Sequence, residues 1–280
     1  MKMNSARQLK KLVNELHEWC ADPTTDRREE IYKSLRKELA SNRPRAAAVA
    51  TGDLRSLANW YGQHGSLAIL DGRIEGWADI DRSLHYEWWS IRIDTSMIAV
   101  PEAALTLAHA LVFEEESMAE WLAERMISSL DDGAFSCWHS ATFGVFILKL
   151  WAIHRGLSDV NVTRPDVSAL GVYQHVLDAW SNPAELRAAL IEACDYHLAQ
   201  SRTAMGYPPF VYSPYQIFPV DMLAIAVVRR GQGLEMPAVE HPLLSTPLAT
   251  PPPREQRPRM KQPDPLLDQV IAKAKATGFL

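Results

Sequence analysis

Cysteine is scarce in this 280-residue chain, and its few cysteines do not suit disulfide bonds. Cys20, Cys137 and Cys194 are odd in number and lie far apart in the sequence. Disulfide-stabilised secreted domains carry even numbers of cysteines at short spacings. We therefore expect buried free thiols in a reducing compartment.

Long hydrophobic runs are also missing. A membrane-spanning helix needs about 18–20 consecutive apolar residues, and the run Ala141–Leu148 is far shorter. The amino terminus has charges threaded between its apolar residues, which is not typical of a secretory signal peptide. These absences predict a cytoplasmic protein with no membrane partner.

Motifs of established catalytic chemistry are absent. The sequence has no glycine-rich phosphate loop, no GxSxG, no HExxH and no CxxC, and the corresponding reactions require those spacings. Cys137 and His139 lie two positions apart, where helical side chains point in different directions. We expect no catalytic residue and no cofactor. An enzyme with an unrecognised helical active site stays open as an alternative, with His139, His175, His197 and Glu87 as its candidates.

A metal site has equally little support. His175 and His197 could collect a metal with Asp195 or Cys194, but neither histidine belongs to an HxxxH pair. Helical histidines more often form ordinary hydrogen bonds, so we expect no metal.

A basic surface of a single sign is lacking as well. Residues 1–60 hold twelve Lys or Arg against eight Asp or Glu, and the two signs alternate along the predicted helices. Such mixing is typical of a solvated helix face, whereas a nucleic-acid groove requires a field of one sign. We expect no nucleic-acid partner.

Helical periodicity dominates what the sequence does contain. Apolar residues recur at spacings of three and four, as Leu9, Leu12 and Leu16 do near the amino terminus. No strong strand pattern is present. The sequence predicts an all-α protein of about ten to eleven helices, packed as antiparallel α-hairpins in a solenoid-like bundle without a fixed repeat period.

Two predicted helices meet at a pair of glycines. One helix begins near Arg45 and ends at Tyr61, because Gly62 and Gly65 follow it. A single long helix is then predicted over residues 66–93, where the apolar spacing of three and four continues for seven turns.

Proline marks the expected domain boundary. Residues 235–262 are rich in proline, which predicts an extended strap or a linker. We therefore divide the chain into a helical domain of residues 1–234, with a possible sub-region 1–62, the proline-rich segment 235–262, and a short helix in 263–280.

The middle of the chain is strongly acidic. Between His64 and Phe135 there are fourteen acidic and four basic residues, a net charge of −10. A charge run is most often a solvated surface, but an acidic face also accelerates association with a basic partner. The residues that would form such a docking face are Glu114, Glu115, Glu116, Glu120, Glu124, Asp131 and Asp132.

Aromatic residues alternate with proline just before the last long apolar helix. Repeated X-Pro steps exclude both helix and central strand, so we expect an ordered loop. Aromatic side chains are frequent anchors at protein interfaces, although a lid packed on the helices is the alternative. The candidate anchors are Tyr207, Phe210, Tyr212 and Tyr215.

The segment that follows, residues 218–244, combines an apolar helix with defined ends. Pro219 and Asp221 suit a first helical turn, and Arg229, Arg230 and Gly231 suit a last one. The segment resembles the carboxyl-terminal signature of the Imm49-type immunity proteins of bacterial toxin loci, where an apolar helix leads through R-G-x-G-L to an HPL turn. The matching residues are Pro219, Ala224, Arg230, Gly231, Leu234, His241 and Pro242.

A second point of resemblance is the apolar helix at Leu67–Leu70, which meets a turn-like position at Gly72 and continues into a long amphipathic helix. The resemblance implies a mostly helical protein, encoded beside a secreted toxin, that neutralises the toxin by occluding or distorting its active site. It implies no catalytic residues, and the expected partner is a basic toxin. A helical scaffold for another protein is the alternative.

Overall fold

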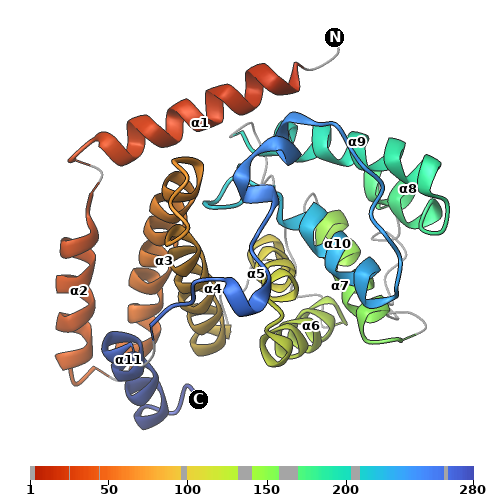
Figure 1. Cartoon of the computed structure of the whole chain (residues 1–280). Helices are drawn as coiled ribbons and strands as arrows, with labels where there is room; N and C mark the ends of the chain where they lie inside the picture. The colour runs from red at the N-terminus through yellow and green to blue at the C-terminus, as the bar shows by residue number, and fades with distance from the viewer. Residues whose placement is uncertain are drawn as a thin grey trace. The chain divides into compact units, whose positions relative to one another are not determined.

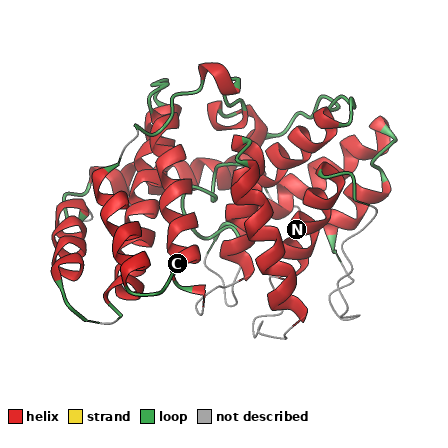
Figure 2. Cartoon of the chain, turned by 90° about the horizontal axis from the view of Figure 1, so that it is seen from below, coloured by secondary structure: helices red, strands yellow, loops and turns green. Residues whose placement is uncertain are grey.

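The computed structural model describes residues 4–24, 26–43, 45–95, 100–131, 141–157, 170–202, 209–261 and 264–280. Within these ranges the chain forms eleven α-helices and no β-strand, as the colouring of Figure 2 makes plain. The predicted all-α class is therefore confirmed.

Contacts group the chain into two compact units. Unit 1 comprises Met1–Leu12 and Ala99–Thr250, and unit 2 comprises Val13–Ile98 and Pro251–Leu280. The first helix, α1 (Ser5–Ala21), begins in unit 1 and ends in unit 2. The division predicted from composition had its boundaries after residues 234 and 262. The two units do not follow these boundaries, because residues 251–280 belong to the same unit as residues 13–98.

Unit 2 is built on a helical hairpin. The long helix α3 (Ala46–Leu70) packs against α4 (Gly76–Ile93), and α2 (Arg28–Ala40) and α11 (Pro265–Ala276) pack against α3 (Figure 1). Leu35, Leu54, Leu57 and Val270 are fully buried where these helices meet. The apolar positions of each helix therefore face one shared core.

The hairpin corrects the predicted helix over residues 66–93. The structure has two helices there, separated at Asp71–Glu75, and α3 continues through Gly62 and Gly65 instead of ending at Tyr61. Gly72 has a φ of +80°, which favours glycine and reverses the chain. Apolar periodicity alone cannot reveal this break, because both helices of the hairpin bury an apolar face.

Two aspartates fasten the carboxyl-terminal segment to α4. Asp264 caps α11 by accepting hydrogen bonds from the backbone nitrogens of Leu266 and Leu267, both at 3.1 Å, and from the Tyr86 hydroxyl at 2.8 Å. The buried Asp81 accepts a hydrogen bond from the Met260 nitrogen at 2.8 Å and pairs with Arg259 at 3.1 Å. These contacts hold the residues before α11, and the start of α11, against α4.

Unit 1 contains the remaining helices. Helix α5 (Val100–Phe113) packs against α6 (Glu116–Asp131), α7 (Ala141–His154) and α10 (Val220–Gly231). The short α8 (Val172–Asp178) packs against α9 (Pro183–Gln200), as Figure 1 shows. Most of α7 is buried, including Phe143 and Phe146, as expected for a helix that is apolar nearly all round.

The segment after α10 is held by three side chains. Arg229 is buried and donates hydrogen bonds to the carbonyl oxygens of Trp180 and Glu235. His241 begins the 3₁₀ turn η4 (Pro242–Ser245) by accepting a hydrogen bond from the Leu243 nitrogen, and its other ring nitrogen contacts Asp195 at 3.2 Å. Further 3₁₀ turns, η5 (Pro247–Ala249) and η6 (Arg254–Gln256), follow.

The end of α10 also differs in detail from the prediction. Gly231 is the last residue of the helix and does not make the turn, whereas Gly233, two residues later, has a φ of +72°. The glycine that the left-handed conformation requires is therefore the second of the R-G-x-G-L pattern.

Candidate functional site

The acidic docking face predicted from the sequence lies mainly on α6. Glu116, Glu120 and Glu124 are exposed and recur every four residues, so they form one row along the helix. Glu114 and Glu115, which connect α5 to α6, are half-buried, and Glu114 has a φ of +58°. Asp131 ends α6, and Asp132 lies outside the described residues.

Arg155, which directly follows α7, partly neutralises this row. Arg155 lies 3.9 Å from a carboxylate oxygen of Glu116 and 3.4 Å from one of Glu120, and His154 contacts Glu116 at 3.0 Å. Exposed pairs of this kind contribute about 0–1 kcal/mol to stability. They shift the most negative part of the row toward Glu124, which forms no ion pair with the described residues.

The aromatic loop does not present its rings as predicted. Phe210 is fully buried and stacks on His197 with ring centroids 3.9 Å apart, and Tyr215 is 5% exposed. Both therefore belong to the core of unit 1 and are not surface anchors. Tyr212 is 39% exposed and is the one described residue of the set that a partner can reach. Tyr207 lies outside the described residues.

A buried polar network explains why the loop folds inward. The two ring nitrogens of His197 contact a carboxylate oxygen of Asp221 and the carbonyl oxygen of Tyr215, each at 2.8 Å. The Tyr173 hydroxyl donates to the second oxygen of Asp221 at 2.8 Å, and the Tyr215 hydroxyl contacts His109 at 3.0 Å. Buried polar groups must be paired, so this network fastens the loop to α9 and α10.

His197 lies between two oxygen atoms, one of the Asp221 carboxyl group and the carbonyl oxygen of Tyr215. Because the side chains of His197 and Asp221 are both 0% exposed, the pair has no access for a substrate in this structure.

The other sequence candidates for chemistry are separated. His175 contacts Glu192 at 2.8 Å, so it and His197 are held by different carboxylates. Burial raises the pKa of the Cys194 thiol, which favours the unreactive neutral form. Cys137 and His139 lie outside the described residues.

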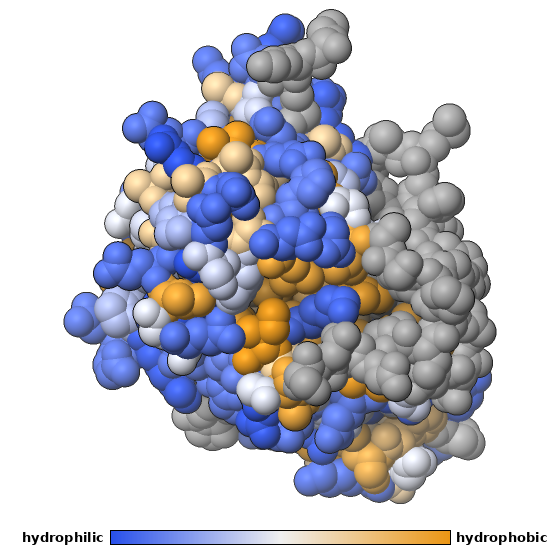
Figure 3. Space-filling model, turned by 90° about the vertical axis from the view of Figure 1, so that its right-hand side faces the viewer, coloured by the Kyte–Doolittle hydropathy of each residue, from blue (hydrophilic) through white to orange (hydrophobic). Residues whose placement is uncertain are grey.

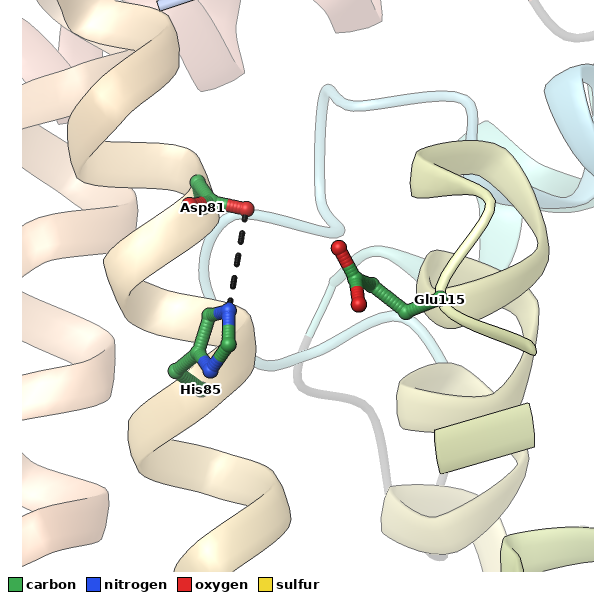
Figure 4. A group of neighbouring side chains, drawn as sticks. All are labelled: Asp81, His85 and Glu115. Atoms are coloured by element: carbon green, nitrogen blue, oxygen red, sulfur yellow. Dashed lines mark ion pairs between the residues drawn. The ribbon is translucent and has the colours of Figure 1, made fainter. Parts of the chain in front are cut away.

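Asp81 and His85 lie one turn apart on α4, and Figure 4 shows their side chains directed toward one another. The His85 ring nitrogen is 4.0 Å from an oxygen of Asp81. Figure 4 also labels Glu115. Glu115 belongs to unit 1, whereas Asp81 and His85 belong to unit 2, and we assign no metal site to these three residues. The role of Asp81 is instead to hold Arg259 and Met260.

Unit 2 contains an open cleft that the sequence had not indicated. It lies between α2, α3 and the end of α1, and its volume is about 410 Å³. Its walls carry two indole rings, two carboxylates and several uncharged polar groups. The lining residues are Trp19, Arg27, Glu30, Ile31, Ser34, Asp53, Ser56, Asn59, Trp60 and Gln63.

A shallower groove of about 370 Å³ lies between α8 and α9 in unit 1. Asp178, Glu185 and Glu192 line it, together with His175 and three alanines. The groove is therefore acidic, like the row on α6. Figure 3 shows apolar residues interspersed with polar ones on one face of the molecule, and we assign no apolar patch to it.

The comparisons with known proteins give no further guide. No protein-family model, no curated protein and no solved structure matches the chain. Among the described helices, none has the length and apolar character needed to cross a bilayer.

Sequence reasoning missed the cleft because none of its residues forms a known motif. One signal was present, since Asp53, Ser56, Trp60 and Gln63 are spaced three, four and three apart and so share one face of α3. Polar and aromatic side chains on one face of α3, opposite polar side chains of α2, are typical of an open groove between two helices. The sequence contains no comparable spacing that would indicate the buried contact between Asp221 and His197.

Proposed function

We propose that this protein binds a basic protein toxin and neutralises it by covering or distorting the toxin's active site. The observation that carries the proposal is the row of exposed carboxylates on α6 at Glu116, Glu120 and Glu124. A row of one sign raises the association rate with an oppositely charged partner and makes that rate sensitive to salt. The acidic groove between α8 and α9 adds negative charge to the same unit.

The buried polar network supports a binding role. It leaves His197, Asp221 and Tyr173 without exposure, so these groups stabilise the fold and do not meet a substrate. A protein that acts by occlusion needs a stable surface and no reactive group. The resemblance of residues 218–244 to immunity proteins of bacterial toxin loci agrees with this role.

Several residues of that resemblance also have defined contacts. His241 and Pro242 form the start of η4, and the chain turns after α10 beyond Gly231. A signature built of such residues preserves the shape of the segment, which is what a binding protein requires.

Co-expression with the product of the neighbouring open reading frame tests the proposal. We expect growth to be rescued by the wild-type chain and lost with Glu116→Lys, Glu120→Lys and Glu124→Lys combined. A triple reversal with the same change in net charge, at the exposed Glu29, Glu255 and Asp268 of unit 2, is the control and should protect. A neighbour that is harmless when expressed alone would refute neutralisation, and binding without protection would favour the scaffold alternative.

A further inference from the structure

Two solvent-accessible histidines lie in the acidic surfaces of unit 1, and each contacts a carboxylate. On the α6 row, Nε2 of His154 lies 3.0 Å from a carboxylate oxygen of Glu116. In the groove between α8 and α9, Nδ1 of His175 lies 2.8 Å from a carboxylate oxygen of Glu192. Histidine is the side chain whose charge ordinarily changes between about pH 5 and pH 8. Both surfaces that support the proposed function therefore contain a group of this kind.

The second ring nitrogen of each of these histidines is open to a proton. Because a carboxylate only accepts hydrogen bonds, the nitrogen that faces it carries the hydrogen, and a neutral ring keeps a lone pair on its other nitrogen. Among the described residues, neither Nδ1 of His154 nor Nε2 of His175 has a hydrogen-bond partner. A proton can therefore add to either ring while the contact with the carboxylate is retained.

His241 shows the opposite arrangement. Its Nε2 lies 3.2 Å from an oxygen of Asp195, but its Nδ1 accepts a hydrogen bond from the Leu243 nitrogen at the start of η4. The side chain of His241 is also buried. A second proton on this ring would displace the hydrogen bond from Leu243, so His241 maintains η4 and is not open to a change of charge in the same way.

The charged groups around His154 determine what a proton changes on the α6 row. His154 faces Glu116, and the next residue, Arg155, contacts both Glu116 and Glu120. Helix α10 meets His154 with its last residue, since a Cβ atom on Gly231 would lie 3.9 Å from Nδ1 of His154. The carboxyl end of a helix favours a nearby cation, so a protonated His154 is compatible with this position.

The remaining charges near the two histidines leave each pair intact. In α10, the buried Arg229 donates to the carbonyl oxygens of Trp180 and Glu235, and Arg230 is exposed. His175 shares its groove only with carboxylates and alanines. The carboxylates are Asp178, Glu185 and Glu192. Protonation of His175 would therefore place a positive charge in a groove that is otherwise negative.

We propose that His154 and His175 make the docking surfaces of unit 1 sensitive to pH, so that these surfaces hold a basic partner more tightly near pH 7.5 than near pH 5.5. As the pH falls, each histidine gains a positive charge and cancels the carboxylate that it contacts. The α6 row and the groove then attract a basic partner less strongly. The proposal rests on the proposed function for the identity of the partner, but the change in charge can be tested without a toxin.

The test measures binding of a fluorescent octalysine peptide to the full chain by fluorescence anisotropy at pH 7.5 and pH 5.5, both at low salt. The lysines of the peptide stay charged at both values, so a change in affinity comes from the protein. We expect the wild type to bind about three- to fivefold more weakly at pH 5.5, because two exposed carboxylates are neutralised. A wild-type chain that does not bind octalysine at pH 7.5, or that binds it equally at both values, would overturn the proposal.

The double variant His154→Gln with His175→Gln separates these two histidines from the others. Its glutamines stay uncharged, so we expect its affinity to be the same at both pH values and to equal that of the wild type at pH 7.5. His17→Gln, at an exposed position of α1, is the control and should keep the wild-type difference. Melting temperatures at both pH values verify that the variants are folded. A folded double variant that keeps the wild-type difference would assign the pH dependence to other groups and refute the proposal.

The outcomes distinguish this proposal from the proposed function. A chain that rescues growth but binds octalysine equally at both pH values refutes the histidine response alone. A chain that shows the response, lost in the double variant, but gives no protection refutes neutralisation alone.

Discussion

Gly65 and Gly76 bring the backbones of α3 and α4 into direct contact. A Cβ atom on Gly65 would lie 2.8 Å from the carbonyl oxygen of Gly76, and one on Gly76 would lie 2.5 Å from the carbonyl oxygen of Gly65. Both distances are shorter than Cβ contacts found in proteins. The two glycines therefore set how closely the central hairpin of unit 2 packs.

Gly65→Ala should destabilise the protein by about 1–3 kcal/mol, because the backbone of α4 must move away from the added methyl group. Gly52→Ala is the matched control, since Gly52 lies in the same helix with nothing within 4 Å of its Cβ position. It should raise stability by about 0.5–1 kcal/mol through helix propensity. Urea unfolding followed by circular dichroism measures both, and equal stability of the two variants would contradict the packing described.

Tyr215 and Tyr212 should respond differently to truncation. Tyr215→Ala removes a 5% exposed side chain and its contact with His109, so we expect a loss of about 3–5 kcal/mol. Tyr212→Ala removes a side chain that is 39% exposed and should cost less than about 1 kcal/mol. Thermal unfolding compares the two. A melting temperature unchanged by Tyr215→Ala would place this residue outside the core.

Stability should fall steeply above pH 10. Burial, followed by the charge of a neighbouring aspartate, raises the pKa of Tyr86 and of Tyr173 above the ordinary value of 10.0. At higher pH the unfolded chain loses these protons while the folded chain keeps them. The unfolded state then binds fewer protons, so the free energy of unfolding decreases by about 1.4 kcal/mol per pH unit for each tyrosine.

Urea unfolding at pH 9 and pH 11 checks this dependence. Tyr86→Phe should reduce the difference between the two pH values by the contribution of one tyrosine. Equal stability of the wild type at both pH values would show that these hydroxyls are not held protonated by the fold.

Charge reversal on α6 should slow association with the toxin. The triple variant at Glu116, Glu120 and Glu124 replaces an attractive field by a repulsive one, so we expect an association rate at least about tenfold lower at low salt. The rate should also lose its decrease with added salt. Stopped-flow mixing at two salt concentrations measures this. Rates like those of the unit 2 control reversal would exclude α6 as the docking face.

The helical fold was largely predictable from the sequence, because each helix carries its own apolar stripe and end signals. Asn182 and Pro183 at the start of α9, and Asp264 and Pro265 at the start of α11, are local signals of this kind. The apolar spacing did not predict the hairpin turn near Gly72, since that spacing continues through it, and only the resemblance marked a turn-like position there. Whether a glycine ends a helix or allows close packing depends on its neighbour in space, as Gly65 shows.

The candidate site was only partly predictable. The row on α6 follows from a spacing of four, which the sequence displays directly. The burial of Phe210 and Tyr215 depends on His197 and Asp221, which come from two other helices. The position of Asp53 in a cleft likewise depends on how α2 lies against α3. Such relations arise from tertiary packing, and a single sequence does not contain them as a local pattern.

The central claim is that the protein acts by occupying a toxin's surface. Titration of the purified toxin's activity with the purified chain tests it most directly. The account predicts loss of activity that is complete near one chain per toxin, and that needs more chain when the α6 carboxylates are reversed. Full toxin activity in the presence of excess folded chain would contradict it.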